Sequence, residues 1–369
     1  MHAVTSPSHP GRTSGLNSLE GVLVSVVGIG VIGAGRIAQA AHLPALARAE
    51  GARLVGLCDP SELLARRVSA RYEAPGYTSV EEMLDDDAVE AVIVAVPDRL
   101  HLPLASQALH AGKHVLVEKP LAGTVEEAEQ LQQLAVESGL HLQVGAMKRY
   151  DPGVQHAAHA IQNKIGRILS ATVWYRVMAG LRPSTEATLF PALVVDQGVR
   201  AHEATFKANR EQYLLTTHGA HVLDGMRYLL GDPTGLSAQM ARADNDLTWH
   251  GLANLAEGGL AHFEITANVH AEWSEGADVY GENGYVKLRT HFPFTLKASD
   301  VEVFDEASAT SERAVFGDSN AYERQIEAFA LAIRNDLPDS PSAEDGVAAV
   351  KLINAVADSV ARGGTKVTL

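Results

Sequence analysis

The stretch "VVGIGVIGAGRIAQAAHLPAL", residues 26–46, decides the fold. Its glycines can be read in two frames, as G-x-G-x-x-G from Gly28 or as G-x-G-x-x-A from Gly33. Both spacings are typical of a strand that turns into a helix whose amino end binds the pyrophosphate of a dinucleotide. The frame from Gly28 would place Gly33 and Gly35 inside the helix, where each costs about 1 kcal/mol relative to alanine. We therefore predict the frame from Gly33, with a buried strand before it and a helix that begins near Arg36.

In this frame the predicted cofactor-binding residues are Gly33, Gly35, Arg36, Ile37 and Ala38. A second apolar segment, residues 53–58, ends at Asp59. A carboxylate at this place, about 20 residues after the glycines, binds the adenosine ribose hydroxyls. Because it would also repel a 2′-phosphate, Asp59 favours NAD, with NADP as the less favoured cofactor. The alternative for Asp59 is an ordinary Asp-Pro turn.

Further apolar strands are expected at residues 91–96 and 114–120, with helical segments between them. Alternation of strand and helix with short links predicts an α/β fold with a doubly wound parallel sheet. The length of 369 residues favours two domains. We assign residues 21–147 to a nucleotide-binding domain and 148–369 to a substrate-binding and oligomerisation domain. Residues 1–20, rich in Ser, Pro, Gly and His, read as a disordered leader.

Composition restricts the partners. A net charge of −15 argues against binding to nucleic acid, because neutralising phosphates requires lysine and arginine. The single cysteine, Cys58, excludes a disulfide framework and a thiolate metal site, and it is consistent with a reducing cytoplasm. Residues 21–35 have the length of a signal-peptide core, but Arg12 is the one basic side chain before them. They are also too short and glycine-rich to span a bilayer, so a buried strand is favoured and no membrane partner is expected.

At "HVLVEKPLAG", residues 114–123, the chain resembles the family of glucose–fructose oxidoreductase, inositol dehydrogenase and MocA (Gfo/Idh/MocA). Further matching stretches are "VPDRLHLPLASQALHAGKHVLVEKP", "VGAMKRYDPG", "HVLDGMRYLLGDP" and "VYGENGYVKL". The resemblance implies an N-terminal Rossmann domain and a C-terminal α/β domain with an open, mostly antiparallel sheet. It implies a homo-oligomer, dimer or tetramer, formed through the open face of that sheet. It also implies hydride transfer between a carbohydrate or polyol hydroxyl and a nicotinamide cofactor, with no metal.

Lys119 is the first predicted catalytic residue. It follows an apolar strand, so partial burial and the charge of an oxidised nicotinamide should lower its pKa and make it a usable acid or base. His221 is the second, because the family usually carries D-x-G-x-H where this chain has Thr217-His218-Gly219-Ala220-His221. Thr217 replaces the aspartate and can hydrogen-bond a substrate hydroxyl, but it cannot relay a proton near neutral pH. His218 is a possible helper.

The remaining candidate residues are implied by the resemblance. Pro97, Asp98 and His101 would lie beside the nicotinamide ribose, with Asp98 in place of the more usual asparagine. Glu118 belongs to the E-K-P motif, beside Lys119 in the cofactor site. Arg149 and Tyr150, at the domain junction, would contact cofactor or substrate or would serve only as a structural linker. Substrate binding is thus assigned to Lys119, Arg149, Tyr150, Thr217 and His221.

Two other features have open interpretations. Residues 176–213 show no clean periodicity and read as a lid or substrate loop, in which Arg176, Arg182 or Tyr213 could contact a polyol. His218, His221 and Asp224 share the spacing of metal ligands on a helix, but no further histidine or cysteine stands at a supporting interval. We therefore predict no metal site, with Asp224 orienting a histidine or capping local structure.

The leading functional interpretation is an NAD(P)-dependent sugar, glycoside or cyclitol dehydrogenase. The first alternative is an NAD-dependent glycosidase, in which transient oxidation allows elimination of the glycosidic bond. The second is a non-catalytic nucleotide-binding regulator, which the presence of both Lys119 and His221 disfavours.

Overall fold

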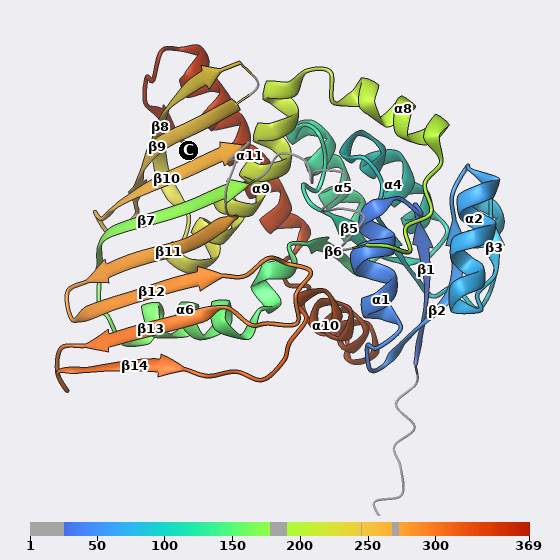
Figure 1. Ribbon diagram of the computed structural model, residues 1–369, viewed down its shortest axis with the longest axis horizontal. Coiled ribbons are helices and arrows are strands. Elements are labelled where there is room, and N and C mark those ends of the chain that lie inside the picture. Colours follow the sequence, from blue (N-terminus) through green and yellow to red (C-terminus); the bar gives the residue numbers. More distant parts are fainter. Residues whose placement is uncertain (1–25, 178–189, 245, 268–272) are drawn as a thin grey trace, which may run out of the picture.

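The computed structural model describes residues 26–177, 190–244, 246–267 and 273–369. The predicted leader at residues 1–20 lies outside the described residues, as does Arg182. Two sheets organise the chain, with most helices packed on or between them (Figure 1). No helix in the described ranges combines the length and the apolar character needed to cross a membrane.

The first sheet is parallel, and its strands lie in the order β3-β2-β1-β4-β5-β6. Its strands are β1 (Val27–Ile32), β2 (Ala52–Cys58), β3 (Gly76–Tyr77), β4 (Ala91–Val94), β5 (His114–Glu118) and β6 (Leu142–Gly145). Its helices are α1 (Leu43–Leu46), α2 (Glu62–Ser69), α3 (Val80–Leu84), α4 (His101–His110) and α5 (Val125–Ser138). Every residue of β1 and β4 is buried, as expected of strands covered on both faces. The predicted doubly wound sheet is confirmed, and its strand order reverses between β1 and β4, where such folds bind ligands.

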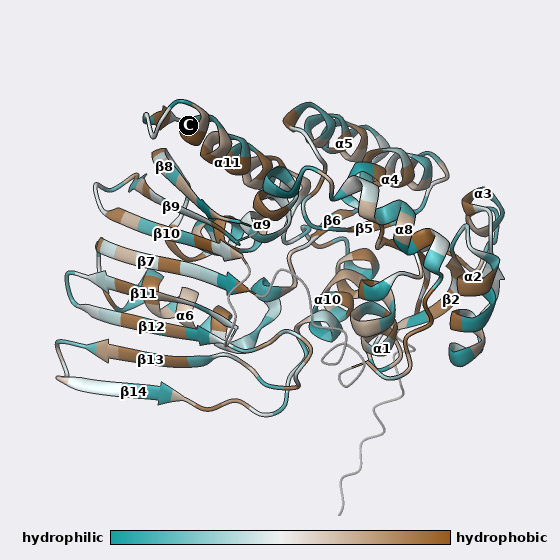
Figure 2. Cartoon of the chain, turned by 45° about the horizontal axis from the view of Figure 1, so that its top comes forward, coloured by the Kyte–Doolittle hydropathy of each residue, from teal (hydrophilic) through white to brown (hydrophobic). Residues whose placement is uncertain are grey.

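The second sheet has the order β14-β13-β12-β11-β7-β10-β9-β8-β15, and its pairs are antiparallel except for β7 with β10. Its strands are β7 (Ile168–Val177), β8 (Pro233–Ala243), β9 (Asp246–Leu255), β10 (Leu260–Ala267), β11 (Ser274–Gly281), β12 (Gly284–Thr290), β13 (Asp300–Asp305), β14 (Thr310–Ala314) and β15 (Val367–Thr368). The predicted hairpin at residues 281–284 joins β11 to β12. The edge strand β14 is polar and exposed (Figure 2), which disfavours pairing with a foreign strand.

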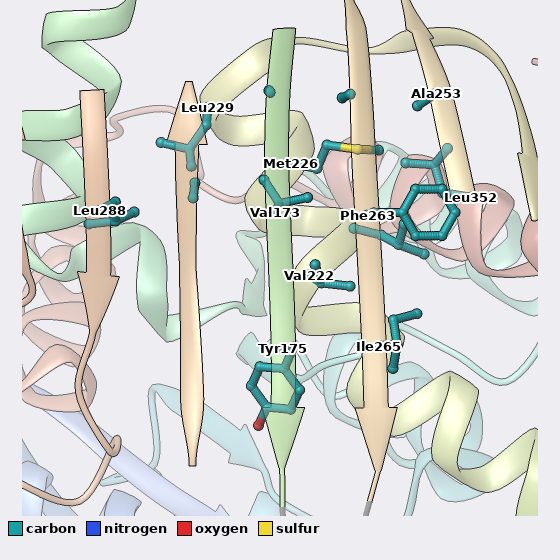
Figure 3. Close-up of a cluster of buried hydrophobic side chains, with 14 of the residues drawn as sticks. Val173, Tyr175, Val222, Met226, Leu229, Ala253, Phe263, Ile265, Leu288 and Leu352 are labelled. Carbon is teal, nitrogen blue, oxygen red and sulfur yellow. The ribbon is translucent and has the colours of Figure 1, made fainter. Parts of the chain in front are cut away.

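Three helices pack on one face of this sheet: α6 (Pro152–Asn163), α9 (Arg210–Leu230) and α11 (Ala343–Ala361). Val222, Met226 and Leu229 of α9 pack against β7 and β10, and Tyr175 lies near the carboxyl end of β7, at the margin of this cluster (Figure 3). The Tyr175 ring therefore lies at the edge of the cluster and faces α9.

The last helices join both units. In α10 (Ala321–Asn335), Tyr322 and Phe329 belong to the apolar cluster beneath β1 and β2. In α11, Val347 packs in the cluster that contains β5, whereas Leu352 packs with the second sheet. The C-terminal end of the chain therefore fixes the two sheets relative to each other.

Candidate active site

The glycine turn has the predicted frame. Gly28 and Gly30 lie within β1, and Gly33 leaves the strand with φ +97°, a conformation that favours glycine. A Cβ on Gly33 would lie 2.5 Å from the Ala95 carbonyl oxygen, whereas one on Gly35 would meet nothing closer than 3.9 Å. Helical structure begins at Arg36, so the backbone at Gly35 leaves open space before a helix amino end, as a pyrophosphate requires.

Asp59 stands at the end of β2 and is 5% exposed. Its carboxylate accepts hydrogen bonds of 2.9 Å from the backbone N–H groups of Ala34 and Ser61. Burial raises the pKa of Asp59, the two N–H groups oppose this, and nearby Asp196 adds to the rise. Asp59 therefore ties the end of β2 to the glycine turn. Its contact with an adenosine ribose stays a prediction.

A segment of the second unit lies against this turn. The side-chain amide of Gln39 pairs with both the C=O (2.9 Å) and the N–H (2.8 Å) of Val194. Ser61 donates to the Asp196 carboxylate over 2.6 Å. The segment continues into α8 (Gln197–Phe206), seen beside α4 in Figure 1. Residues 176–213 show no clean periodicity and were interpreted as a lid or substrate loop, so this helix was not predicted. No local sequence signal indicated that the segment contacts the glycine turn.

The E-K-P turn is held from two sides. Glu118, at the end of β5, is 6% exposed and bonds the buried His42 ring nitrogen Nε2 over 2.8 Å. Its other oxygen accepts the Lys119 backbone N–H at 3.1 Å. His101 is 1% exposed, and its ring nitrogens lie 2.8 and 3.0 Å from the carbonyl oxygens of Pro120 and Val96. His101 thus connects the loop that contains Pro97 and Asp98 to the turn.

Lys119 reaches across to α9. Its Nζ lies 3.4 Å from the backbone carbonyl oxygen of Thr217. Burial lowers the pKa of Lys119, while the nearby carboxylates Glu118 and Asp98 oppose the shift. The structure therefore brings together the lysine that follows β5 and a threonine of α9, which were predicted from separate motifs. The side chain of Lys119 remains partly exposed, as a group that meets a substrate must be.

Both candidate histidines project from α9 onto Tyr175. The ring centroids of His218 and His221 lie 5.6 and 5.1 Å from that of Tyr175. Burial, with the charges of Lys119 and Lys148, lowers the pKa of His218 to about 3 and lowers that of His221 well below its ordinary value. Both imidazoles are therefore neutral at pH 7. The Nδ1 atom of His218 is buried and has no hydrogen-bond partner among the residues that the structure describes.

Sequence reasoning missed an ion pair beside these histidines. Lys148 contacts the Glu275 carboxylate, and its Nζ lies 4.7 Å from the Tyr175 ring centroid and 5.2 Å from that of Trp273. Thr290 donates to the same carboxylate over 3.0 Å. Lys148 stands within a motif that the resemblance singled out, whereas nothing in the sequence around Glu275 marks it.

Arg149 and Tyr150 have structural partners. Arg149 is 8% exposed and donates two hydrogen bonds to Asp224, of 3.0 and 2.6 Å, and one to Asp345. The Tyr150 hydroxyl donates to the carbonyl of Ser340. These contacts support the linker interpretation, and contact of either residue with a ligand stays a prediction. Asp224 pairs with Arg149, so the expectation that it orients a histidine was wrong.

Metal ligation has no support in the described ranges. No three histidine, cysteine, aspartate or glutamate side chains are grouped there in a way that could hold a metal ion. The spacing of His218, His221 and Asp224 on α9 does not produce such a group, because the Asp224 carboxylate points into the Arg149 ion pair.

Comparisons with known proteins agree with this architecture. Two family models match the chain: an oxidoreductase family with an NAD-binding Rossmann fold over residues 27–146, and the GFO/IDH/MocA C-terminal domain over residues 154–287. Inositol 2-dehydrogenase 2 of Saccharopolyspora erythraea is 30% identical over 350 residues, which cover 91% of this chain and 94% of that protein.

Two solved structures share the fold. A 3-ketoreductase from Actinomadura kijaniata, in complex with TDP-benzene and NADP, has a TM-score of 0.72 and 22% identity, covering 91% of this chain and 98% of that one. An oxidoreductase from Agrobacterium radiobacter, in complex with NAD⁺, L-tartaric acid and magnesium, has a TM-score of 0.75 and 17% identity, covering 93% and 98%. The chain belongs to the Gfo/Idh/MocA family of NAD(P)-binding oxidoreductases, as its sequence motifs predicted.

Proposed function

We propose that the protein is an NAD(P)-dependent dehydrogenase that oxidises a secondary hydroxyl of a sugar or cyclitol. The observation that carries this proposal is the meeting of Lys119, at the end of β5, with Thr217 on the helix that presents His218 and His221. This meeting point lies at the carboxyl ends of parallel strands, where ligands bind in such sheets. The similarity to an inositol 2-dehydrogenase supports a ring polyol as substrate.

The proposed roles follow from protonation states. NAD(P), when bound at the glycine turn, would supply the nicotinamide that takes up the hydride. His221 is assigned as the acceptor of the hydroxyl proton; burial and the charges of Lys119 and Lys148 lower its pKa, so it is neutral at pH 7 but is a weaker base than a free imidazole. Lys119, whose pKa burial also lowers, donates a hydrogen bond to the substrate oxygen or exchanges the proton with it. The buried Tyr175 ring packs against His218 and His221 and so supports both imidazoles.

The test is reduced-nicotinamide absorbance with purified protein, either cofactor, and a panel of inositols, hexoses, anhydrosugars and aryl glycosides. NADH or NADPH formation on one class of ring polyol is the expected result. Release of an aglycone without net reduction of the cofactor would instead indicate the glycosidase chemistry. Tight cofactor binding with neither reaction would contradict the dehydrogenase proposal and favour a regulator.

For the cofactor, we propose a preference for NAD. Asp59 and Asp196 converge on Ser61 at the end of β2, where the 2′-phosphate of NADP would meet two carboxylates. Asp196→Asn keeps a side chain that can cap α8 and removes one charge. We expect this variant to lower the ratio of kcat/KM with NAD to kcat/KM with NADP by roughly three- to tenfold. Asp318→Asn, at an exposed carboxylate, is the control, and an unchanged ratio in Asp196→Asn would remove that residue from cofactor selection.

The Thr217 side chain is testable apart from its backbone. Thr217→Val preserves the carbonyl that Lys119 contacts and deletes only the hydroxyl. We expect kcat/KM to fall roughly tenfold, the value of about one hydrogen bond to a buried polar partner, with most of the effect on KM. Unchanged steady-state constants would show that the hydroxyl does not touch the substrate.

We also propose a cytoplasmic homo-oligomer. The sheet face opposite α9 exposes apolar side chains at Leu252, Leu260 and Tyr280, and Trp174 lies among them between two arginines. Such a face is typical of a subunit interface. Light scattering that gives a monomer at micromolar concentration would contradict this assignment.

A further inference from the structure

The buried Lys148–Glu275 pair has no role in the mechanism proposed above, yet it borders the site. Lys148 and His221 both contact the ring of Tyr175, at 4.7 and 5.1 Å from its centroid. Glu275 pairs in register with Tyr175 across β11 and β7, so it projects on the same face of the sheet, toward α9. Glu275 is 8% exposed, so the carboxylate is largely withdrawn from water.

A small cavity connects the pair to the histidine. Its volume is about 40 Å³, and its polar lining includes Lys148, His221, Glu275 and Thr290. Two charged groups and the imidazole therefore line one small, partly open space among mostly apolar side chains, in which their interaction is less screened than in bulk water.

The charges around His221 explain why a carboxylate matters there. Lys119 after β5, Lys148 before α6 and His218 on α9 all disfavour a proton on this imidazole. Near Lys119 the opposing carboxylates are Glu118 and Asp98, and near Lys148 there is also Asp151. Glu275 is the carboxylate in direct contact with Lys148, so it directly offsets that positive charge.

We propose that Glu275 is a positioning residue that holds Lys148 and balances its charge, so that His221 can take up the hydroxyl proton. The inference rests on the proposed dehydrogenase function. In the step it serves, the substrate carbon loses hydride to the oxidised nicotinamide and the oxygen loses its proton to His221, which leaves a carbonyl group. His221 then releases the proton to solvent. The positive charge that forms on His221 is the charge that an uncompensated Lys148 would oppose.

The test measures the kcat/KM–pH profile of three variants. The two single variants should shift its acid limb in opposite directions, and the double variant should not shift it. Glu275→Gln leaves Lys148 uncompensated, so the acid limb of the kcat/KM–pH profile should move to lower pH by about one unit, with kcat reduced about tenfold or more. Lys148→Met removes the opposing cation, so the limb should move to higher pH. The double variant Lys148→Met/Glu275→Leu removes the whole pair and should return the limb close to its wild-type position.

A purely structural pair would not give opposite shifts. Glu264→Gln is the matched control, because Glu264 pairs with Arg176 on the other face of the same sheet, and its limb should not move. NMR titration of ¹⁵N-histidine-labelled protein without cofactor gives a second readout, in which the His221 ring pKa should fall in Glu275→Gln and rise in Lys148→Met. Unchanged titrations, or shifts in the same direction, would overturn the inference. Failure of the wild type on every substrate would overturn the proposed function, while the NMR titrations still decide the coupling.

Discussion

Replacement of Lys119 by methionine is expected to lower kcat by about 10³-fold or more while cofactor affinity changes little. Methionine fills similar space but can neither donate to the substrate oxygen nor exchange a proton with it, and a positioned acid or base contributes about 10² to 10⁴-fold. Lys119→Arg should lower kcat almost as much. A guanidinium does not release its proton, and its planar, forked group does not fit the place of an ammonium. Stopped-flow or steady-state absorbance of the reduced cofactor measures the loss, and calorimetry measures cofactor binding.

Lys113→Met is the matched control for this experiment. Lys113 immediately precedes β5, at the opposite end of the strand from Lys119, and its Nζ lies 3.4 Å from the backbone carbonyl oxygen of Asp86. Its replacement should leave kcat within about twofold, because ligands bind at the carboxyl ends of parallel strands. A Lys119→Met enzyme that keeps more than a tenth of wild-type kcat would contradict a catalytic role for Lys119 and leave His221 as the acid–base residue.

The nucleotide half of the site could be predicted from the sequence because its signals are local. Gly33 needs a positive φ and has a neighbouring carbonyl where a side chain would be, so the frame of the motif follows from backbone sterics alone. Asp59 and Glu118 each end a buried strand, and strand ends in a parallel sheet meet at one edge. For these residues, the sequence therefore predicts both the residue type and its place at the ligand-binding edge of the sheet.

The contacts that could not be predicted join segments that are distant in the sequence. Glu275 reaches Lys148 because β11 lies beside β7 in the sheet, an order that the sequence of the strand does not encode. His42 bonds the glutamate of the E-K-P motif, 76 residues further along the chain. Asp196 meets Ser61 only because its segment crosses to the first unit. Tertiary packing decides each of these contacts, and local periodicity contains no trace of them.

The second large effect is expected on stability, at Arg149. Its guanidinium binds Asp224 on α9 and Asp345 at the start of α11, and so connects the segment after β6 to two helices of the second unit. Arg149→Met would leave the buried Asp224 carboxylate without its principal partner. Removing one member of a buried ion pair costs about 3–5 kcal/mol, so we expect the free energy of unfolding in urea to fall by this amount.

The double variant Arg149→Met/Asp224→Leu shows whether the stability lost in Arg149→Met comes from the unpaired Asp224 carboxylate or from the loss of the arginine side chain itself. If the loss in Arg149→Met comes from the stranded carboxylate, replacing that carboxylate by an apolar side chain should restore most of the lost stability. Asp345 keeps Arg227 at 3.2 Å in either variant, so it is not stranded in turn. Arg48→Met, which breaks the more exposed pair with Glu323, should cost less than about 1 kcal/mol. A double variant no more stable than Arg149→Met would mean that the arginine stabilises the junction by its own packing, for example against the Tyr228 ring 5.2 Å away, rather than by neutralising Asp224.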